Sequence, residues 1–493
     1  MPSVDTFQFD NSYAAELKGF YVPWKGEAVP DPKIVQLNTE LSAELGLDLE
    51  VLASPQGAAF FAGVVAPPGA EPLAQAYAGH QFGGFSPMLG DGRALLLGEL
   101  IDGDGVRRDL QLKGAGRTPF SRGGDGKAVL GPVLREYLIG EAMHALGIPT
   151  TRALAAVTTG DSVFREGPQP GAVLARVAAS HLRIGTFQFF SARQEIERVR
   201  QLADYSLRRH FPDLATDENP YLALLGAVSQ RQAVLVAKWL SVGFVHGVMN
   251  TDNMTISGET LDYGPCAFID AYDTGAVFSS IDQHGRYAYG NQPAIAQWNL
   301  SRLAETLLPL INPDDSEDAV RMATEEIERF MPMYQAFWLA DMRAKLGLSR
   351  AEDGDRGLTE DLLAVMQAQT VDFTGLFRAL AQVLRGDTAV AHALFDDPTE
   401  LAPWLERWLA RLEREDADAE LTASGMDGVN PIYIPRNHKV EEALQAAADS
   451  SDYEPFKKLL AVLENPFDQR EGLEGYEGPA PESFGPYKTF CGT

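Results

Sequence analysis

Two hydrophobic patterns meet near residue 186, and this change limits the possible folds more than any other feature of the chain. Before it, apolar runs at 93–101 and 106–113 are joined by Asp-Gly-Asp-Gly, a strong signal for a β-hairpin. After it, apolar residues recur mostly at helical spacing, as they do in residues 222–244, 301–311, 319–346 and 358–384. The pattern predicts a sheet-rich lobe followed by a helical lobe.

One helix interrupts the sheet-rich part. Pro132 suits a first helical turn, and apolar residues recur at helical spacing from there to about Gly147. Glu136 lies in the early turns of this helix, and Lys113 lies at the end of the second hairpin strand. Three further strands are predicted at 153–157, 162–165 and 172–177, with 166–171 connecting the last two.

The stretch from His246 to Met254, followed by Asp262-Tyr263-Gly264, has the spacing of a protein kinase catalytic loop and its metal-binding motif. His246 and Asn253 match this pattern. The position of the loop aspartate, which accepts the proton of the substrate hydroxyl, is occupied by Val248, and valine cannot take a proton. We expect the chain to bind a metal–nucleotide complex without running ordinary kinase chemistry.

The run K-G-A-G-R-T-P-F-S-R-G-G-D-G-K-A-V-L at 113–130 and the loop H-G-V-M-N-T-D-N-M at 246–254 together resemble the selenoprotein O family. The resemblance covers most of the chain, which is identified as a cysteine-containing bacterial member. It implies a pseudokinase fold and transfer of AMP from ATP to Ser, Thr or Tyr hydroxyls of proteins; transfer of UMP from UTP is also attributed to the family. We therefore expect an α+β, protein-kinase-like bilobal fold with an N-terminal extension and a helical C-terminal part.

Four regions are expected along the chain. They are an N-terminal extension (1–72), a sheet-rich kinase-like lobe (73–185), a helical lobe with the catalytic loop (186–400), and an acidic C-terminal segment with a Cys-containing tail (401–493). The acidic runs at 413–420 and 471–482 are interpreted as solvated surface.

Lys113 and Glu136 fit the strand lysine and helix glutamate with which kinases position phosphate oxygens. Gly90-Asp91-Gly92-Arg93 resembles a glycine-rich phosphate loop, because glycines let backbone N–H groups approach anions. The family resemblance implies that Gly90, Gly92, Arg93, Asp125 and Gly126 belong to the nucleotide site. It also makes Arg176 and Arg183 phosphate ligands, a role that suits the planar donor fork of arginine.

Asn253 and Asp262 offer hard oxygen ligands, which suit Mg²⁺ or Mn²⁺ shared with phosphate oxygens. The family assigns the role of base to Asp252, the carboxylate next to Asn253; the alternative from the residues alone is a loop-capping aspartate. Asp270 and Asp273 are expected to serve turns or caps. The resemblance also implies an inverted nucleotide, in which Lys113 and the two arginines hold the β- and γ-phosphates as the leaving group.

The charge balance, 41 basic against 69 acidic residues, gives a net charge of −28, which repels phosphate backbones and anionic membranes and argues against both as partners. The first residues lack the features of a secretory signal, and no stretch approaches the roughly 20 apolar residues that span a bilayer. A cytoplasmic protein is expected, with ATP and hydroxyl-bearing proteins, including its own chain, as partners.

The two cysteines, Cys266 and Cys491, are too few for a disulfide framework. Cys491 matches the selenocysteine position of selenium-containing family members, and a disulfide with Cys266 would tether the tail beside the site; otherwise Cys266 is a buried apolar residue and Cys491 an idle thiol. Gly131-Pro132-Val133 departs from the Arg-Ser-containing segment of many members, which leaves the position of Glu136 intact.

Two other functions stay open from the residues alone. A catalytically silent nucleotide-binding scaffold is favoured by Val248, although Lys113, Glu136, Asn253 and Asp262 count against it. A phosphotransferase with Asp252 as its base would release ADP rather than pyrophosphate.

Overall fold

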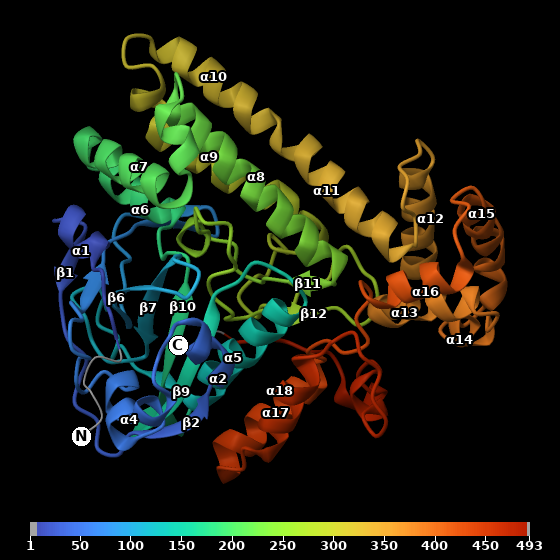
Figure 1. The fold of residues 1–493 in the computed structure, drawn as a ribbon, viewed down its shortest axis with the longest axis horizontal. Helices are drawn as coiled ribbons and strands as arrows, with labels where there is room; N and C mark the ends of the chain where they lie inside the picture. Colours follow the sequence, from blue (N-terminus) through green and yellow to red (C-terminus); the bar gives the residue numbers. More distant parts are fainter. Residues whose placement is uncertain (1–6, 491–493) are drawn as a thin grey trace.

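The computed structural model describes residues 7–490, with a sheet-rich N-terminal part and a helical C-terminal part, as predicted (Figure 1). The main sheet is antiparallel and has the order β1-β3-β6-β7-β10-β9-β2, with β8 paired to β10. Its strands are β1 (Tyr21–Pro23), β2 (Lys33–Leu37), β3 (Leu73–Gln75), β6 (Ala94–Ile101), β7 (Arg107–Lys113), β8 (Ala128–Val129), β9 (Arg152–Phe164) and β10 (Pro168–Ala178). Two small sheets pair β4 (Gly79–Gln81) with β5 (Gly84–Ser86), and β11 (Phe244–Val245) with β12 (Ala267–Phe268).

The predicted division of 153–165 into two strands is wrong. β9 runs through this region as one strand, and β10 begins at Pro168, inside the predicted connection. Gly160 adopts a positive φ of 77°, and the pairing of β9 with β10 shifts register between Pro170 and Ala172. The register shift is therefore accommodated within one continuous hairpin of β9 and β10.

Both edge strands of the sheet come from the first 72 residues, so part of the expected extension completes the sheet. The short helices there are α1 (Ser12–Glu16), α2 (Thr39–Glu44), α3 (Leu49–Leu52) and α4 (Pro55–Phe61). Phe60 and Phe61 of α4 share a buried cluster with Leu110 and Leu112 of β7. The other face of β7 carries Lys113 toward the site described below.

The predicted helix after Pro132 is present as α5 (Leu130–Ala145), which packs on β9 and β10. The helical part begins with α6 (Ile184–Ser191), α7 (Ile196–His210), α8 (Pro220–Ser241), α9 (Gln292–Ile311), α10 (Ser316–Glu328) and α11 (Phe330–Lys345). It continues with α12 (Asp355–Ala368), α13 (Phe373–Leu384), α14 (Ala389–His392), α15 (Ala402–Glu413), α16 (Ala419–Asp427), α17 (Asn437–Ser450) and α18 (Glu454–Leu463). Short 3₁₀ segments include η2 (Thr251–Asn253) in the predicted catalytic loop.

Two of the runs with helical periodicity each form two helices in the structure. The run at 319–346 is split between α10 and α11 near Arg329, because Pro332 lacks the N–H that would continue the helical hydrogen bonds. The run at 358–384 is split before Asp372, whose side chain caps the start of α13 by accepting from the N–H of Gly375.

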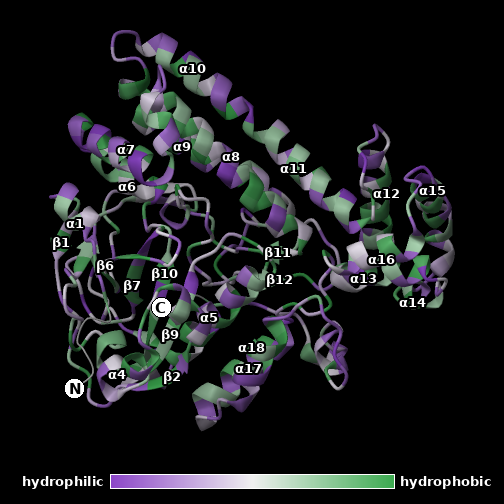
Figure 2. Ribbon diagram, in the orientation of Figure 1, coloured by the Kyte–Doolittle hydropathy of each residue, from purple (hydrophilic) through white to green (hydrophobic). Residues whose placement is uncertain are grey.

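Apolar and polar residues alternate along both the strands and the helices (Figure 2), and the larger buried apolar cluster includes residues of the sheet, α5, α8, α9 and α13. Between residues 7 and 490, no helix is both long and apolar enough to cross a bilayer.

The C-terminal segment is packed rather than loose. Helices α17 and α18 pack against α5, on the side of the sheet-rich part (Figure 1). Arg436, fully buried, bonds to Asp372 at 2.6 Å and to Asp270 at 2.8 Å, which joins this segment to the helical part. Asp270 thus serves an ion pair, while Asp273 caps a turn by accepting from Gly275 as expected.

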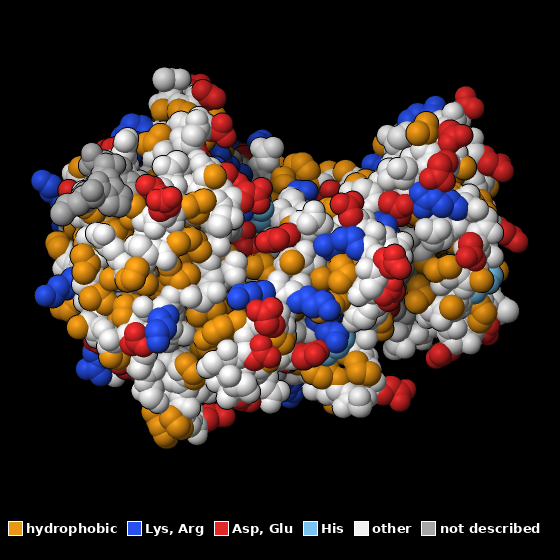
Figure 3. All heavy atoms as spheres, turned by 60° about the horizontal axis from the view of Figure 1, so that its bottom comes forward, with side chains coloured by type: hydrophobic (Ala, Val, Ile, Leu, Met, Phe, Trp, Pro, Cys, Tyr) orange, Lys and Arg blue, Asp and Glu red, His pale blue; other side chains and the backbone are white. Residues whose placement is uncertain are grey.

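Acidic and basic side chains are interspersed on the face drawn in Figure 3. The interpretation of 413–420 as solvated surface is wrong for Glu415. Its carboxylate is buried, accepts from Arg411 at 2.6 Å, and also accepts from Ser349. A buried carboxylate needs such partners. The hydrogen bond to Ser349 attaches the end of α15 to the segment before α12.

Lys345, at the end of α11, gives a prediction about stability. Its ammonium is buried 4.4 Å from the ring centre of Phe377, and burial lowers the lysine pKa to about 7 against the opposing charge of Asp341. Because the folded pKa lies below the usual 10.5, the unfolded chain binds more protons between these values, and stability rises with pH across that window. Lys345→Met should therefore stabilise the fold at pH 7, by on the order of 3 kcal/mol.

Thermal melts at pH 7 and pH 10 check this expectation. The gain in Tm should shrink at the higher pH, and Lys457→Met, at an exposed lysine of α18, should leave the Tm unchanged at both. A lower Tm for Lys345→Met at pH 7 would contradict the account.

Candidate active site

A cleft of about 480 Å³ lies between the sheet and the loop after α8, and all twelve residues predicted for the site line it. From the sheet-rich part these are Gly90, Gly92, Arg93, Lys113, Asp125, Gly126, Glu136, Arg176 and Arg183; from the loop they are Asp252, Asn253 and Asp262.

Lys113 is the centre of this cleft. Its ammonium forms ion pairs with the carboxylates of both Glu136 and Asp262. One charged group thus connects β7, α5 and the loop. Burial alone would raise the pKa of Asp262, but the charges of Lys113 and Arg176 outweigh it and hold that pKa well below its usual range. Two of the three ammonium donors are thus used, and one is left for a ligand.

Arg176 and Arg183 are both buried and line the cleft. They differ in how many of their N–H groups donate hydrogen bonds to other residues. Arg176 donates to Gln111 at 2.7 and 2.9 Å, to Glu136 at 2.9 Å, and to the carbonyl of Leu261 at 3.1 Å. Arg183 donates to two backbone carbonyls, including that of Asp252 at 3.1 Å, and stacks on the Tyr77 ring. More of the N–H groups of Arg183 are therefore available to an anion.

The predicted catalytic loop is fixed by hydrogen bonds. The backbone N–H of His246 donates to Gln292, and burial lowers the pKa of the His246 ring to about 4, so the ring is neutral at neutral pH. Asn253 donates its amide to the carbonyl of Val248 at 3.0 Å, which leaves its side-chain oxygen for another partner. Val248 lines the cleft and offers no proton acceptor on its side chain.

Asp252 is buried at the floor of the cleft. Burial raises its pKa to about 6, against the lowering effects of Arg183 and of a 3.3 Å hydrogen bond from Gln81. Its second oxygen, Oδ1, makes no hydrogen bond within the described chain. Gly79 leaves room there, since a Cβ at that residue would lie 2.4 Å from this oxygen. A buried carboxylate with one unused oxygen is able to accept a proton from a ligand.

A divalent metal fits the residues present when its other ligands come from phosphate and water. Within residues 7–490, no group of three or more His, Cys, Asp or Glu side chains forms a metal site by itself. The free side-chain oxygen of Asn253 and the carboxylate of Asp262 are both hard donors that line the cleft. This donor set is typical of Mg²⁺, which keeps several waters and binds substrate phosphates.

The Gly90 loop does not offer its backbone N–H groups to a ligand in this structure. Those of Gly90, Asp91 and Gly92 donate to the carbonyls of Tyr77, Gln75 and Gly90, respectively. Gly90 has a φ of 69°, and a Cβ there would lie 2.3 Å from the ring of Phe120. The expectation that this loop's glycines expose backbone donors is therefore wrong here: Gly90 makes room for a packed aromatic ring.

Asp125 is held by a two-bond ion pair with Arg165, at 2.8 and 3.0 Å. Gly126, which follows it, has a φ of 70°, and a Cβ there would lie 2.1 Å from the carbonyl of Gly116. Only glycine fits this close approach, so the turn that places Asp125 at the cleft depends on it.

The motifs did not point to Gln81, to the side chain of Asp91, or to Phe120 and Arg165, which line the cleft, nor to Gln111, which is fully buried behind it. Gln111 could have been found. Asp109, Gln111 and Lys113 alternate with Leu110 and Leu112, and a strand places these three polar side chains on one face. The others depend on packing between segments far apart in the sequence.

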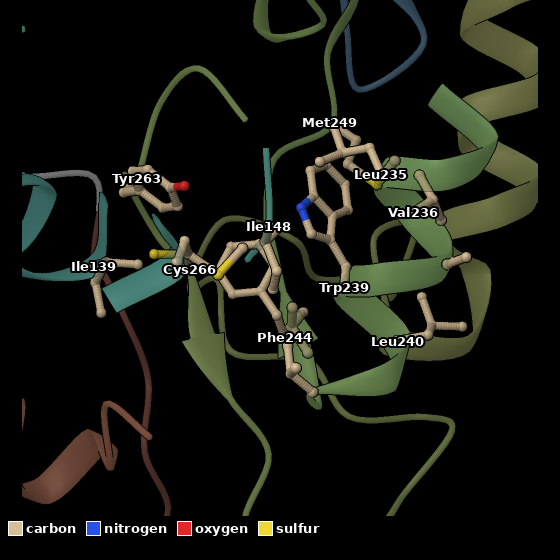
Figure 4. Close-up of a cluster of buried hydrophobic side chains, with 14 of the residues drawn as sticks. Ile139, Ile148, Leu235, Val236, Trp239, Leu240, Phe244, Met249, Tyr263 and Cys266 are labelled. Carbon is tan, nitrogen blue, oxygen red and sulfur yellow. The ribbon is translucent and has the colours of Figure 1, made fainter. Parts of the chain in front are cut away.

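Cys266 is a buried thiol among Ile139, Ile148, Phe244 and Tyr263 (Figure 4). Burial raises its pKa to about 12, which keeps it protonated and unreactive at neutral pH. Its predicted partner, Cys491, lies outside the described residues. The chain nevertheless reaches the cleft, since Phe490 lines it and Thr489 pairs with Ser279.

Proteins of several bacteria are similar to this chain along its length. Proteins named "Protein nucleotidyltransferase YdiU" match it at 61% identity in Cereibacter sphaeroides (99% of this chain, 100% of the relative) and at 57% in Rhizobium leguminosarum bv. trifolii (99% and 97%). A third, in Rhizobium meliloti, matches at 56% (99% and 99%). The chain is accordingly an enzyme of the protein nucleotidyltransferase class.

The family itself follows from a second comparison. The model of the family described as "Protein adenylyltransferase SelO" matches residues 4–464, and the chain belongs to this family. The family membership predicted from the sequence is thus confirmed.

Proposed function

We propose that this enzyme transfers AMP from ATP to Ser, Thr or Tyr hydroxyls of proteins and releases pyrophosphate. The observation that carries the proposal is the joining of Lys113 to both Glu136 and Asp262 in a cleft that also holds two buried arginines. Such an arrangement of fixed positive charge beside a metal-ligand aspartate suits the phosphates of a metal–nucleotide complex.

Lys113, Arg176 and Arg183 would hold the β- and γ-phosphates, so that pyrophosphate is the leaving group. Asn253 and Asp262 would hold Mg²⁺ or Mn²⁺, which neutralises charge that develops on phosphate oxygens when bound. Gly90, Gly92, Arg93, Asp125 and Gly126 line the same cleft and would complete the nucleotide site.

Asp252 would accept the proton of the attacking hydroxyl. With a pKa of about 6 it is mostly ionised at neutral pH, and its unused oxygen is the acceptor. The acceptor hydroxyl must then approach the α-phosphorus near Asp252, which requires a nucleotide turned around relative to its pose in a kinase. A kinase-like bilobal fold, divided near residues 72, 185 and 400, is part of the same proposal.

Other parts of the proposal concern control and range. UTP could replace ATP, the chain could modify itself, and the enzyme would act in the cytoplasm. A disulfide between Cys266 and Cys491 would tie the tail beside the cleft; the burial of Cys266 means that this segment must open before the thiol reacts.

Mass spectrometry of the products tests the proposed function. The purified enzyme is incubated with Mg²⁺ or Mn²⁺ and with ATP or UTP, together with a bacterial protein extract, and modified peptides are mapped. We expect an added AMP on hydroxyl side chains. Added phosphate in its place would indicate the phosphotransferase, and addition to non-hydroxyl side chains would contradict the proposed acceptor.

A further inference from the structure

A buried glutamine connects the charged groups of the cleft. Gln111 lies on β7 directly across from Arg176 on β10, on the same strand face as Lys113, and is fully buried. Its side-chain oxygen accepts from Nε and Nη2 of Arg176, at 2.9 and 2.7 Å. Its side-chain nitrogen donates to the buried carboxylate of Asp91 at 3.3 Å.

The chemistry of Arg176 and Asp91 requires a group between them that both accepts and donates hydrogen bonds. A guanidinium only donates hydrogen bonds, and an ionised carboxylate only accepts them. A residue that joins Arg176 to Asp91 must therefore accept on one side and donate on the other, as the amide of Gln111 does.

The hydrogen bonds to Gln111 fix the orientation of the Arg176 guanidinium. An arginine has five N–H groups, and the four bonds to Gln111, Glu136 and the Leu261 carbonyl leave one, on Nη2. The nitrogen that keeps a free N–H is thus the one that Gln111 holds. Asp91 extends the connection, because it lies 3.6 Å from Nη2 of Arg183.

The inference about Gln111 rests on the proposed function, in which Arg176 and Arg183 both hold phosphates of ATP. We infer that Gln111 is a positioning residue: its amide joins Arg176 to Asp91 and so orients the remaining N–H of Arg176 toward a phosphate of the nucleotide. It touches neither the nucleotide nor the acceptor hydroxyl.

Gln111→Met, which keeps the length of the side chain and removes its three hydrogen bonds, tests this role. Because these hydrogen bonds join charged groups, their loss is costly, and we expect the Kd for ATP to rise roughly tenfold or more. Binding of adenosine, which has no phosphates, should stay unchanged. Gln297→Met, at a partly buried glutamine of α9 outside the cleft, is the matched control and should change neither affinity.

A double mutant separates positioning from a merely structural role. If Gln111 acts through Arg176, then Gln111→Met should weaken ATP binding no further in an Arg176→Met background. Additive losses, an equal loss for adenosine, or an unchanged Kd for ATP in a folded Gln111→Met protein would each overturn the inference.

The same variants distinguish a wrong inference about Gln111 from a wrong proposed function. If Arg176→Met itself leaves ATP binding unchanged while the protein stays folded, the assignment of Arg176 to phosphate is wrong. If Arg176→Met weakens ATP binding and Gln111→Met does not, only the inference about Gln111 fails. Far-UV circular dichroism and Tm values for each variant establish that the comparisons concern folded protein.

Discussion

Replacing Asp262 with asparagine is expected to lower the rate of nucleotidyl transfer by roughly three orders of magnitude, because the variant loses a charged metal ligand. The substitution would also leave the Lys113 ammonium with Glu136 as its one carboxylate partner. Initial rates with Mg²⁺ and with Mn²⁺, over a range of metal concentrations, measure this effect.

Asp273→Asn is the matched control for this variant. Asp273 lies eleven residues further along and caps a turn outside the cleft, so its substitution should leave the rate unchanged. A rate for Asp262→Asn within tenfold of the unmodified enzyme would contradict the assignment of Asp262 to the metal.

The second large effect is expected at Asp252. Asparagine has nearly the same shape but cannot accept the proton of the acceptor hydroxyl, and general base catalysis typically contributes 10²–10⁴-fold. Asp252→Asn should therefore lower kcat by roughly that factor, while the Kd for ATP changes little because Asp252 binds no phosphate in the proposed pose.

Single-turnover kinetics and equilibrium binding of ATP separate these two quantities. An unchanged kcat for Asp252→Asn would mean that another group accepts the proton. A loss of ATP binding equal to the loss of rate would instead place Asp252 in the nucleotide site.

The sequence predicted which residues lie in the cleft better than how they are held there. Motif spacing and family resemblance identified twelve residues, and all line one cleft. The connection from Arg176 through Gln111 to Asp91 was missed. These residues lie on β10, on β7 and in the loop before β6, and they become neighbours only when the sheet forms. The expectation that Gly90 exposes a backbone N–H to phosphate was wrong for a similar reason, since this N–H donates to the Tyr77 carbonyl and Phe120, thirty residues further along, fills the space beside Gly90.

The main errors in secondary structure have different origins. The break between α10 and α11 was visible in the sequence as Pro332, which the apolar periodicity obscured. The continuity of β9 was not visible, because Gly160 and Asp161 have the composition of a turn. They stay within one strand because Thr158 and Ser162 on either side of them pair with β10. The local sequence favoured a turn at this point, but the pairing of β9 with β10 determined the structure.

The most direct test of the account is the origin of the group that reaches the protein. ATP labelled at the α-phosphate and ATP labelled at the γ-phosphate are given separately to the enzyme with Mg²⁺ or Mn²⁺, beside the Asp262→Asn variant. We expect protein to acquire label from the α-position, with pyrophosphate released and little signal from the variant. Label that enters protein from the γ-position only would contradict the account and indicate a kinase.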